Sequence, residues 1–518
     1  MANNDPVLIP YVIQEGSLWY VAYKEKNPFV PEITVSAKGI ANHMSEEIND
    51  GCDFGPDSYN PSVTSGVPLT QTSGLQEAYN YVFINGGLTA FVLPGNYLID
   101  VPLLINSLSI PNVSTEIFSA SMIGSARTYG LTTIQISDNF DVSSNTVMIY
   151  IGTGAHSFQG EFSNININGI APNGNRVQTG IYVGNIFGAT ISGIANRVNQ
   201  NPRDYLIYQL GSGGGTGNAP LIKNINAYSC SLYFEPNAEC FYSNISQDFY
   251  SIPFTIGCTG NGGDTGPTLT NLNLWNPNVN NSGAGAIQLL GGAGTTTILN
   301  NVAIHNPYNS TVIVDLSQAG SGFFIINGLA SESTPIGTLV NWDDNTNTGV
   351  NLTITGINIH MDPSYPLLDM ATNNTTPFTI KVVGGIIYSG SIPDLVNESI
   401  SAGQLFEVDD VVVSNGSDTP LTPSISTNPP ASATVYQNNT PYDIIIYLPA
   451  YASTAGTAGY VTLAKGPTSS VSTIGNQYVS GDTSDSSEQI IPLTVPAGWY
   501  YEFVTSGTTL GTAVVQAV

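Results

Sequence analysis

A column of polar and aromatic side chains recurs at a nearly regular spacing along the middle of the chain, each member three residues after an apolar residue. We call this column the lane; its members are Asn168, Arg197, Tyr228, Asp248, Trp275, His305, Glu332, His360 and Ser389. Alternate side chains of a strand point to opposite faces, so a residue three positions after an inward apolar residue faces outward. The residue directly after the apolar one is mostly small, so a row of small residues runs beside the row of larger ones.

The lane has the residue types that bind sugars. Tyr228 and Trp275 can stack on sugar faces, and the polar groups of Asp248, His305 and His360 can bind hydroxyls. Glu332, between two histidines, could also act as a general acid or base. The alternative is that exposed strand ends simply carry mixed polar residues.

Glycoside cleavage is a more demanding chemistry, because it uses two carboxylates about 5–10 Å apart. Asp248 and Glu332 are three repeats apart, about 14 Å at the spacing of stacked strands. A second column fits better: Asp315, Asp369 and Glu407, with Asp343 and Asp344 between them. If the chain is an enzyme, we expect a glycoside hydrolase that uses Asp315, Asp369 and Glu332. The alternative is solvated acids in turns, and we expect no metal and no cofactor.

The apolar residues that precede the lane define an internal repeat. Each follows a small or polar residue, usually Asn or Gly; the repeated positions are Ile165, Ile194, Ile225, Ile245, Leu272, Val302, Leu329, Ile357 and Ile386. Their spacings are 29, 31, 20, 27, 30, 27, 28 and 29 residues. A period of this size indicates a solenoid, and alternation with period two indicates strands.

A second strand follows in most repeats, as in "GIYVGN", "PFTIGC", "AIQLLGG", "VIVDLS", "PLLDMA" and "LFEVDD". Repeats with two or three strands that stack in parallel form a parallel β-helix, whose core exists only through stacking. The open end would expose unpaired strand edges. A short helix expected at 75–83 would cap that end.

Composition excludes several classes of function. Charged residues make up 9% of the 518 residues, and 37 acids against 10 bases give a formal net charge of -27. Such a surface repels nucleic acid and anionic lipid. We expect no membrane insertion and no signal peptide, because no apolar run is long enough to span a bilayer and no basic segment precedes an apolar one. The spacing of Cys52, Cys230, Cys240 and Cys258 matches no zinc pattern, which leaves buried thiols or one disulfide among the last three.

The stretch from Gly74 to Ile105 resembles the start of the pectate-lyase-like β-helix domains of viral tailspikes and polysaccharide-degrading enzymes. The matching residues are Leu75, Gln76, Ala78, Gly86, Gly87, Leu93, Pro94, Gly95 and Tyr97. The resemblance implies an all-β, right-handed parallel β-helix. The paired-Asp, Gly-His-Gly and Arg-x-Lys signatures of polygalacturonases are absent, and only two lysines lie in the repeats. The catalytic residues of those enzymes are therefore not carried over.

Three parts are predicted: an N-terminal particle-attachment segment at 1–70, the β-helix at 71–420, and a C-terminal antiparallel β-sandwich at 421–518. A Pro-, Ser- and Thr-rich boundary lies at 417–436, and long aromatic strands follow it. "NPPASATVYQNNTPYDIIIYLPAY" and "NDGCDFGPDS" resemble segments in surface proteins of archaeal viruses, including spindle-shaped ones. The resemblance implies that the chain forms trimers or other symmetric assemblies, as structural virus proteins of this type do.

These resemblances imply a virion tailspike or tail-fibre protein on the particle surface, bound to host cell-surface glycans or glycoproteins and to other virion tail proteins. A homotrimer or another symmetric oligomer is expected. Two alternatives stay open. The first is a glycan-cleaving hydrolase on the same fold, because fold does not decide function. The second is a cellular surface-layer or filament protein.

Overall fold

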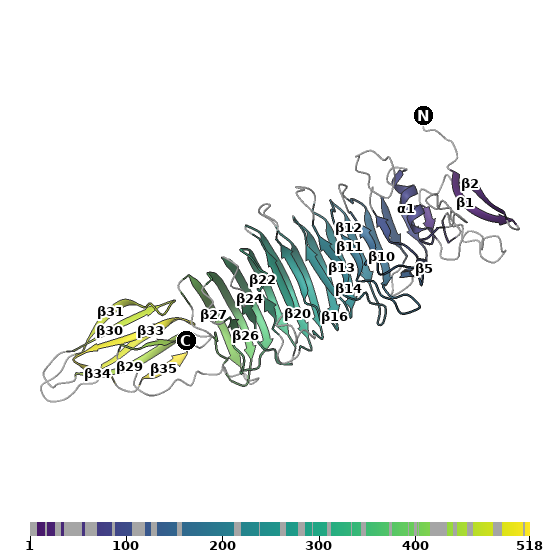
Figure 1. Ribbon diagram of the computed structural model, residues 1–518. Coiled ribbons are helices and arrows are strands. Elements are labelled where there is room, and N and C mark those ends of the chain that lie inside the picture. The colour runs from purple at the N-terminus through teal and green to yellow at the C-terminus, as the bar shows by residue number, and fades with distance from the viewer. Residues whose placement is uncertain are drawn as a thin grey trace. The chain divides into compact units, whose positions relative to one another are not determined.

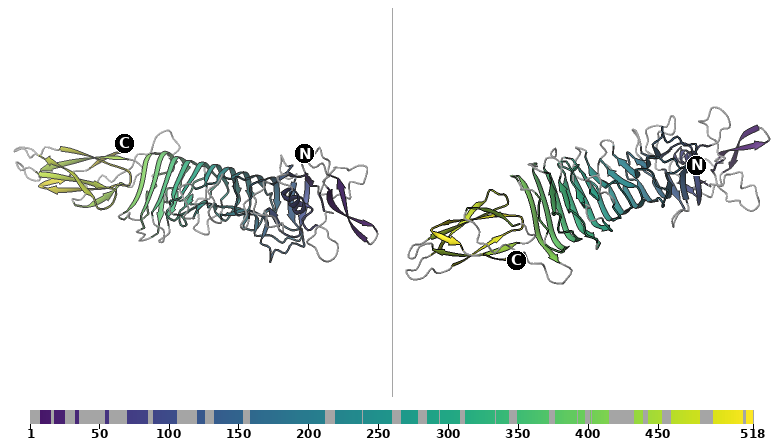
Figure 2. Two further views of the ribbon diagram at one scale, coloured as in Figure 1. Left: turned by 90° about the horizontal axis from the view of Figure 1, so that it is seen from above. Right: turned by 60° about the horizontal axis from the view of Figure 1, so that its bottom comes forward.

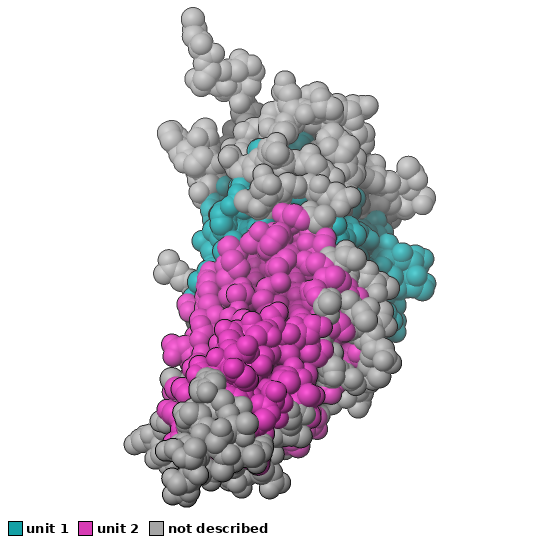
Figure 3. Space-filling view, turned by 90° about the vertical axis from the view of Figure 1, so that its left-hand side faces the viewer, with its two compact units in different colours: residues 1–275 teal, residues 276–518 magenta. Residues whose placement is uncertain are grey.

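The computed structural model divides the chain into two compact units, residues 1–275 and residues 276–518 (Figure 3). Each unit is described by itself. The described residues are 8–15, 18–25, 33–35, 54–56, 70–84, 89–105, 120–125, 132–152, 158–211, 219–237, 239–259, 266–277, 285–292, 294–307, 312–332, 334–342, 349–371, 376–391, 393–397, 401, 403–414, 433–438, 443–452, 459–479, 489–510 and 513–517.

Unit 1 contains two sets of parallel strands that alternate along the chain. The first set pairs in sequence order and consists of β3 (Ile33–Val35), β4 (Thr89–Val92), β7 (Ser121–Gly124), β10 (Glu161–Asn168), β12 (Thr190–Ala195), β14 (Leu221–Tyr228), β16 (Phe241–Asp248) and β18 (Thr268–Trp275). The second set consists of β6 (Leu103–Ile105), β9 (Val147–Ile151), β11 (Thr179–Val183), β13 (Tyr205–Leu210), β15 (Ser231–Glu235) and β17 (Phe254–Cys258). Each strand pairs with the next member of its own set, which defines a parallel β-helix.

Three further pairings complete unit 1. β5 (Gly95–Ile99) pairs in parallel with β8 (Thr132–Ile136), and β8 pairs with the end of β10. β1 (Leu8–Glu15) and β2 (Leu18–Glu25) form an antiparallel hairpin.

Residues 285–414 of unit 2 also contain two sets of parallel strands that alternate along the chain. The first set consists of β20 (Thr296–His305), β22 (Phe323–Ser331), β24 (Val350–His360), β26 (Phe378–Tyr388) and β27 (Gln404–Ser414). The second consists of β19 (Ile287–Gly291), β21 (Val314–Asp315), β23 (Val340–Trp342) and β25 (Leu368–Met370). The first-set strands lie side by side in sequence order, in Figure 1 and in both views of Figure 2. One first-set strand and the second-set strand after it form one turn, here called a rung.

A left-handed residue in the first-set strands explains why Asn or Gly precedes the repeated apolar residue. In β24, Val350, Leu352 and Ile354 are buried, then Gly356 has φ +64°, and burial resumes one position later at Ile357. The left-handed residue adds one position and reverses which face the following side chains occupy. Asn and Gly adopt this conformation at the lowest cost. The same position is left-handed at Asn164, Gly193, Asn224, Asn244, Asn271, Asn301, Gly328 and Gly384.

The expected helix is α1 (Leu75–Ile84), which packs on β3, β4, β6 and β7. Its apolar face is buried, with Leu75, Ala78 and Val82 fully covered. The Gln76 side chain pairs with the backbone of Leu104 on β6: its amide donates to the Leu104 carbonyl (2.9 Å), and it accepts from the Leu104 N–H (2.7 Å). The helix therefore supplies hydrogen-bond partners to a strand at the edge of the solenoid, which is what a cap must do. No helix within the described residues is long and apolar enough to span a membrane.

The C-terminal residues form two small antiparallel sheets, as expected. One sheet consists of β28 (Val435–Gln437), β33 (Tyr500–Ser506), β30 (Gly459–Gly466) and β31 (Ser472–Val479). The other consists of β32 (Gln489–Val495), β29 (Ile444–Ala452), β34 (Thr508–Leu510) and β35 (Val514–Ala517). Both sheets contribute to one apolar core that includes Ile446, Val461, Leu493 and Phe503. This arrangement is a β-sandwich, whereas the boundaries at 70/71 and 420/421 stay predictions.

Candidate functional site

The lane of unit 1 has the predicted register over its last three members. Tyr228 pairs with Asp248, and Asp248 pairs with Trp275. The Trp275 side chain is 37% exposed. Arg197 is exposed beyond the end of β12, whereas Asn168 is buried and its Oδ1 accepts a hydrogen bond from the N–H of Ile170 (3.2 Å). Asn168 pairs with the half-buried Gln135, next to the inward pair of Ile167 and Ile134, so it occupies the predicted outward position but is covered.

Buried and strained groups hold Tyr228 in place. The Asn196 side chain, 3% exposed, donates to the Tyr228 carbonyl (2.7 Å) and accepts from the Tyr228 N–H (2.8 Å). The ring of Phe249 lies 5.4 Å from the Tyr228 ring and is 53% exposed. Phe249 has φ +51°, an uncommon conformation for a bulky residue. Unit 1 thus presents a fixed pair of partly exposed rings that the sequence pattern did not reveal.

In unit 2 the last member of the lane is Tyr388 and not the predicted Ser389. His360 pairs with Tyr388, because Ile357 pairs with Gly385 and not with Ile386. The left-handed residue of this rung is Gly384, so the position that is apolar in other rungs is a glycine here. The sequence pattern selected the next apolar residue and named Ser389. The lane of unit 2 is therefore His305, Glu332, His360 and Tyr388.

These four side chains form two contacting pairs. His305 Nδ1 lies 2.7 Å from Glu332 Oε1, with 18% and 46% of the two side chains exposed. The His360 and Tyr388 rings are stacked, with centroids 4.7 Å apart and planes 19° apart. The His360 N–H donates to the Ser331 hydroxyl (2.9 Å), which connects the two pairs through the residue before Glu332. The arrangement places two stacked rings beside a polar pair.

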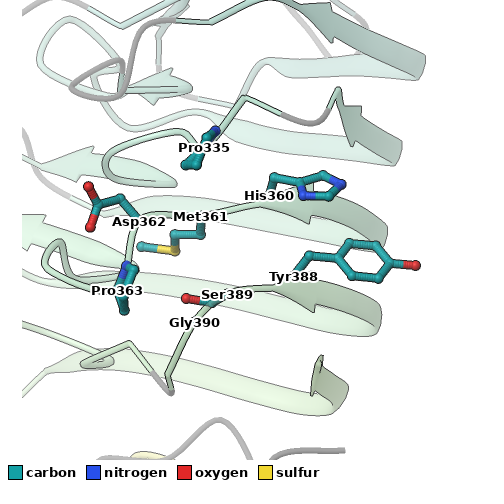
Figure 4. A pocket seen from close by; sticks show the side chains of 8 residues that line it. All are labelled: Pro335, His360, Met361, Asp362, Pro363, Tyr388, Ser389 and Gly390. Carbon is teal, nitrogen blue, oxygen red and sulfur yellow. The ribbon is translucent and has the colours of Figure 1, made fainter. Parts of the chain in front are cut away.

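A hollow of about 450 Å³ borders the stacked pair. It is lined by Pro335, His360, Met361, Asp362, Pro363, Tyr388, Ser389 and Gly390. Figure 4 shows the His360 and Tyr388 rings projecting in the same direction from adjacent strands, with Asp362 on the turn that follows. The Asp362 carboxylate accepts from the Ser364 N–H (2.9 Å) and hydroxyl (2.6 Å), and these bonds lower its pKa.

The second predicted column is part of a polar ladder on the other set of strands. Gln288 pairs with Asp315, Asp315 with Asn341, and Asn341 with Asp369. Asp315 is 1% exposed, and its oxygens accept from the Ser317 N–H (2.9 Å) and hydroxyl (3.0 Å). The Asp369 carboxylate accepts from the Asn397 amide (2.6 Å). Asn341 thus lies between the two carboxylates, whose positions are about two strand spacings, or roughly 10 Å, apart.

The third carboxylate of that column lies elsewhere. "LFEVDD" is part of β27, a first-set strand, where Glu407 pairs with Lys381 of β26 and forms an ion pair with it (2.6 Å). The grouping of Glu407 with Asp315 and Asp369 was therefore wrong. Asp343 and Asp344 lie outside the described residues. No group of three metal-ligating side chains occurs in the described part of the chain.

The three cysteines within the described residues, Cys230, Cys240 and Cys258, are free and buried, which confirms the thiol alternative. Burial raises the pKa of the Cys240 thiol to about 12 and also raises that of Cys230. Because the thiolate is the reactive form, we expect no modification by a disulfide reagent at pH 8 in a Cys52→Ser background. Three equivalents should react after denaturation in guanidinium. Rapid labelling of the native protein would contradict this burial.

A column of tyrosines on the second set of unit 1 was not predicted. Tyr150, Tyr182, Tyr208 and Tyr233 occupy paired positions, with successive ring centroids 5.8, 6.0 and 4.5 Å apart. The Tyr233 hydroxyl donates to Glu235 (2.6 Å). The signal in the sequence is a tyrosine after an apolar residue in each strand, at spacings of 32, 26 and 25 residues. Because the rings mainly face one another, the column stabilises the stack of rungs.

Fold and site together define a class: parallel β-helix proteins with an outward row of polar and aromatic groups. Three phage tailspikes are among the solved structures that the chain resembles. Gp49 of Acinetobacter baumannii bacteriophage Fri1, a capsular polysaccharide depolymerase, is 12% identical over 100% of this chain and 92% of that chain, with a TM-score of 0.37. The tailspike of E. coli bacteriophage HK620 is 11% identical over 86% and 89% (TM-score 0.38). Tailspike protein 3 of bacteriophage CBA120 is 10% identical over 83% and 69% (TM-score 0.39).

No protein-family model matches the chain, and no curated protein sequence matches it. Resemblance to solved structures at this distance assigns no activity. The function is therefore argued from the residues of the chain itself.

Proposed function

We propose that the chain is a tailspike- or fibre-type structural protein on the surface of a virus particle, and that it attaches to glycans of the host surface through the lane. The observation that carries this proposal is the lane of unit 2. His305, His360 and Tyr388 are the last residues of β20, β24 and β26, and Glu332 directly follows β22. His360 and Tyr388 border a hollow.

The geometry suits a sugar ring. The His360 and Tyr388 rings face each other at 4.7 Å, so a pyranose would contact their edges or the outer face of one ring through its C–H groups. The His305–Glu332 pair, on the preceding strands, offers a donor and acceptors to its hydroxyls. Strands stacked about 4.8 Å apart place these groups at a spacing close to one sugar unit. A glycan chain that follows the row would contact one side chain after another.

The opening stretch supports the tailspike part of the proposal. Gln76, one of the residues that carry the resemblance, closes the edge at β6. Tyr97, another, is buried and donates to the carbonyls of Val35 and Leu93, both at 2.8 Å. The resemblance therefore rests on residues that build the capped end. Attachment through several copies of a symmetric oligomer would compensate for weak single sites, with other virion tail proteins as partners of the N-terminal segment.

Binding is favoured over cleavage because the lane of unit 2 holds one carboxylate, Glu332, within the described residues. The other two carboxylates predicted to be catalytic, Asp315 and Asp369, are hydrogen-bonded on the other set of strands, and Asp315 is buried. A hydrolase needs a second carboxylate that reaches the same glycosidic bond. The His305–Glu332 pair could still serve as an acid–base group, so hydrolysis is the second candidate function.

The test is binding of the full chain to purified glycans of candidate hosts, compared with Tyr388→Ala and His360→Ala. Each change removes half of the stacked pair, and we expect a loss of affinity of about tenfold or more. Tyr460→Ala is the matched control, because Tyr460 is a 49% exposed tyrosine of the C-terminal sandwich. Its affinity should equal that of wild type.

Two results would change the proposal. Equal loss of affinity in the Tyr460 control would place recognition in the sandwich and leave the β-helix as a shaft. Release of reducing ends by wild type, abolished by Glu332→Gln, would replace attachment by hydrolysis.

A further inference from the structure

We infer that the unit 2 site selects glycans whose sugars carry no acidic group, and that a free amine on the sugar strengthens binding. The inference rests on the glycan contact proposed above and adds the chemical class of the ligand. It follows from which charges border the hollow and the lane, and from where the few bases of this unit lie.

Bases are nearly absent from unit 2. Residues 276–518 contain 17 Asp and Glu, two Lys and no Arg. Lys381 is engaged by Glu407 at 2.6 Å, and the Lys465 ammonium donates to the Thr494 carbonyl at 2.8 Å within the sandwich. Recognition of carboxylate, sulfate or phosphate groups normally uses the donors of Arg or Lys. Neither lysine lines the hollow or belongs to the lane.

Two carboxylates border the position of the ligand. Asp362 lines the hollow, and hydrogen bonds from Ser364 favour its ionised form. Glu332 is 46% exposed beside His305, next to Ser331, which bonds to the His360 backbone. A glycan that extends from the His360 and Tyr388 rings into the hollow would reach Asp362, and along the lane it would reach Glu332, so both carboxylates would repel an acidic group on it (Figure 4).

Both carboxylates would attract an ammonium group on the sugar, whereas they would repel an acidic group. The exposed face of an aromatic ring adds a favourable interaction with a cation. Neutral sugars would lack this contribution but would suffer no repulsion. The expected order of affinity is therefore amine-bearing, then neutral, then acidic sugars of the same linkage and length.

The experiment uses the full chain at pH 8 and an array with matched amine-bearing, neutral and acidic oligosaccharides. We expect binding to neutral and amine-bearing members, at least tenfold stronger than to the acidic member of the same set. Binding of the amine-bearing member should weaken as salt rises from 50 to 500 mM, because salt screens exposed charges. Binding of the neutral member should change little.

Charge variants test the residues. In Asp362→Lys the ratio of acidic to neutral binding should rise at least tenfold. The control is Asp409→Lys, the same charge change at an exposed residue of β27 outside the lane and hollow, for which the ratio should stay that of wild type. Preference of wild type for an acidic glycan, lost in Tyr388→Ala, would overturn the inference and leave the glycan contact standing. Absence of binding to every member would overturn the contact as well.

Discussion

Replacing Gly385 by alanine is expected to destabilise unit 2 by roughly 3 kcal/mol and to weaken glycan binding. Gly385 has φ +122°, and an added Cβ would lie 2.0 Å from the carbonyl oxygen of Ile357 on β24. Backbone atoms cannot move aside as a flexible side chain can. The β24–β26 pairing must therefore open at the point that sets Tyr388 against His360.

The adjacent glycine provides a matched control. Gly384 also has positive φ (+69°), but an added Cβ would meet no atom of the described residues within 4 Å. Gly384→Ala should cost only the left-handed backbone energy of an L-residue, about 1–2 kcal/mol. Gly384→Asn should cost less, because asparagine occupies the equivalent position of other first-set strands, as at Asn244 and Asn271.

The measurement is the free energy of unfolding from guanidinium titration, with hydrogen exchange of β24 and β26 to localise the change. Equal stability of the alanine variants at 384 and 385 would show that the close approach to Ile357 is not a constraint. Glycan affinity measured below the unfolding transition would then report whether Tyr388 has moved.

Trp342→Ala is expected to destabilise unit 2 by about 3–5 kcal/mol, the usual cost of emptying a large buried aromatic site. The Trp342 side chain is fully buried, and its ring contacts that of Phe378 edge to face at 5.9 Å. This contact joins β23 to β26 across the interior of the solenoid. Removing the indole leaves a cavity that strands on both sides cannot fill.

Trp342→Phe separates the loss of packing from the loss of the polar group. Among the described residues the buried Trp342 Nε1 has no hydrogen-bond partner, so phenylalanine removes an unsatisfied donor along with part of the ring. We expect less than half of the loss seen with alanine. Trp275→Ala, at a side chain 37% exposed, should change stability by less than about 1 kcal/mol. Equal effects of Trp275→Ala and Trp342→Ala would contradict the burial of Trp342.

Much of the lane could be predicted because the repeat contains its own register. Tyr228, Asp248 and Trp275 follow an apolar residue that pairs in register from strand to strand, and so do His305 and Glu332. At the rung of β26 the same reasoning failed by one residue. Backbone conformation, not side-chain type, decides which position pairs with Ile357, and a glycine there leaves no apolar signal.

The column of acidic residues shows a second limit of prediction from the sequence. Asp315 and Asp369 do share a column, but Asn341 occupies the rung between them, and Glu407 belongs to the other set of strands. Loops of different length separate the two strands of each rung, so spacing along the chain does not say which strand a residue belongs to. The tyrosine column escaped notice for the same reason.

By itself the sequence determined the strands, the parallel stacking, the capping helix and the C-terminal sandwich. These follow from local patterns: alternation with period two, Asn or Gly at a left-handed position, and an apolar helical face before the first strand. Only the tertiary structure decided that Tyr388 stacks on His360, that His305 contacts Glu332, and that Asp315 is buried. Those facts depend on which strand lies beside which and at what register, and hydrogen bonds between residues far apart in the chain set that register.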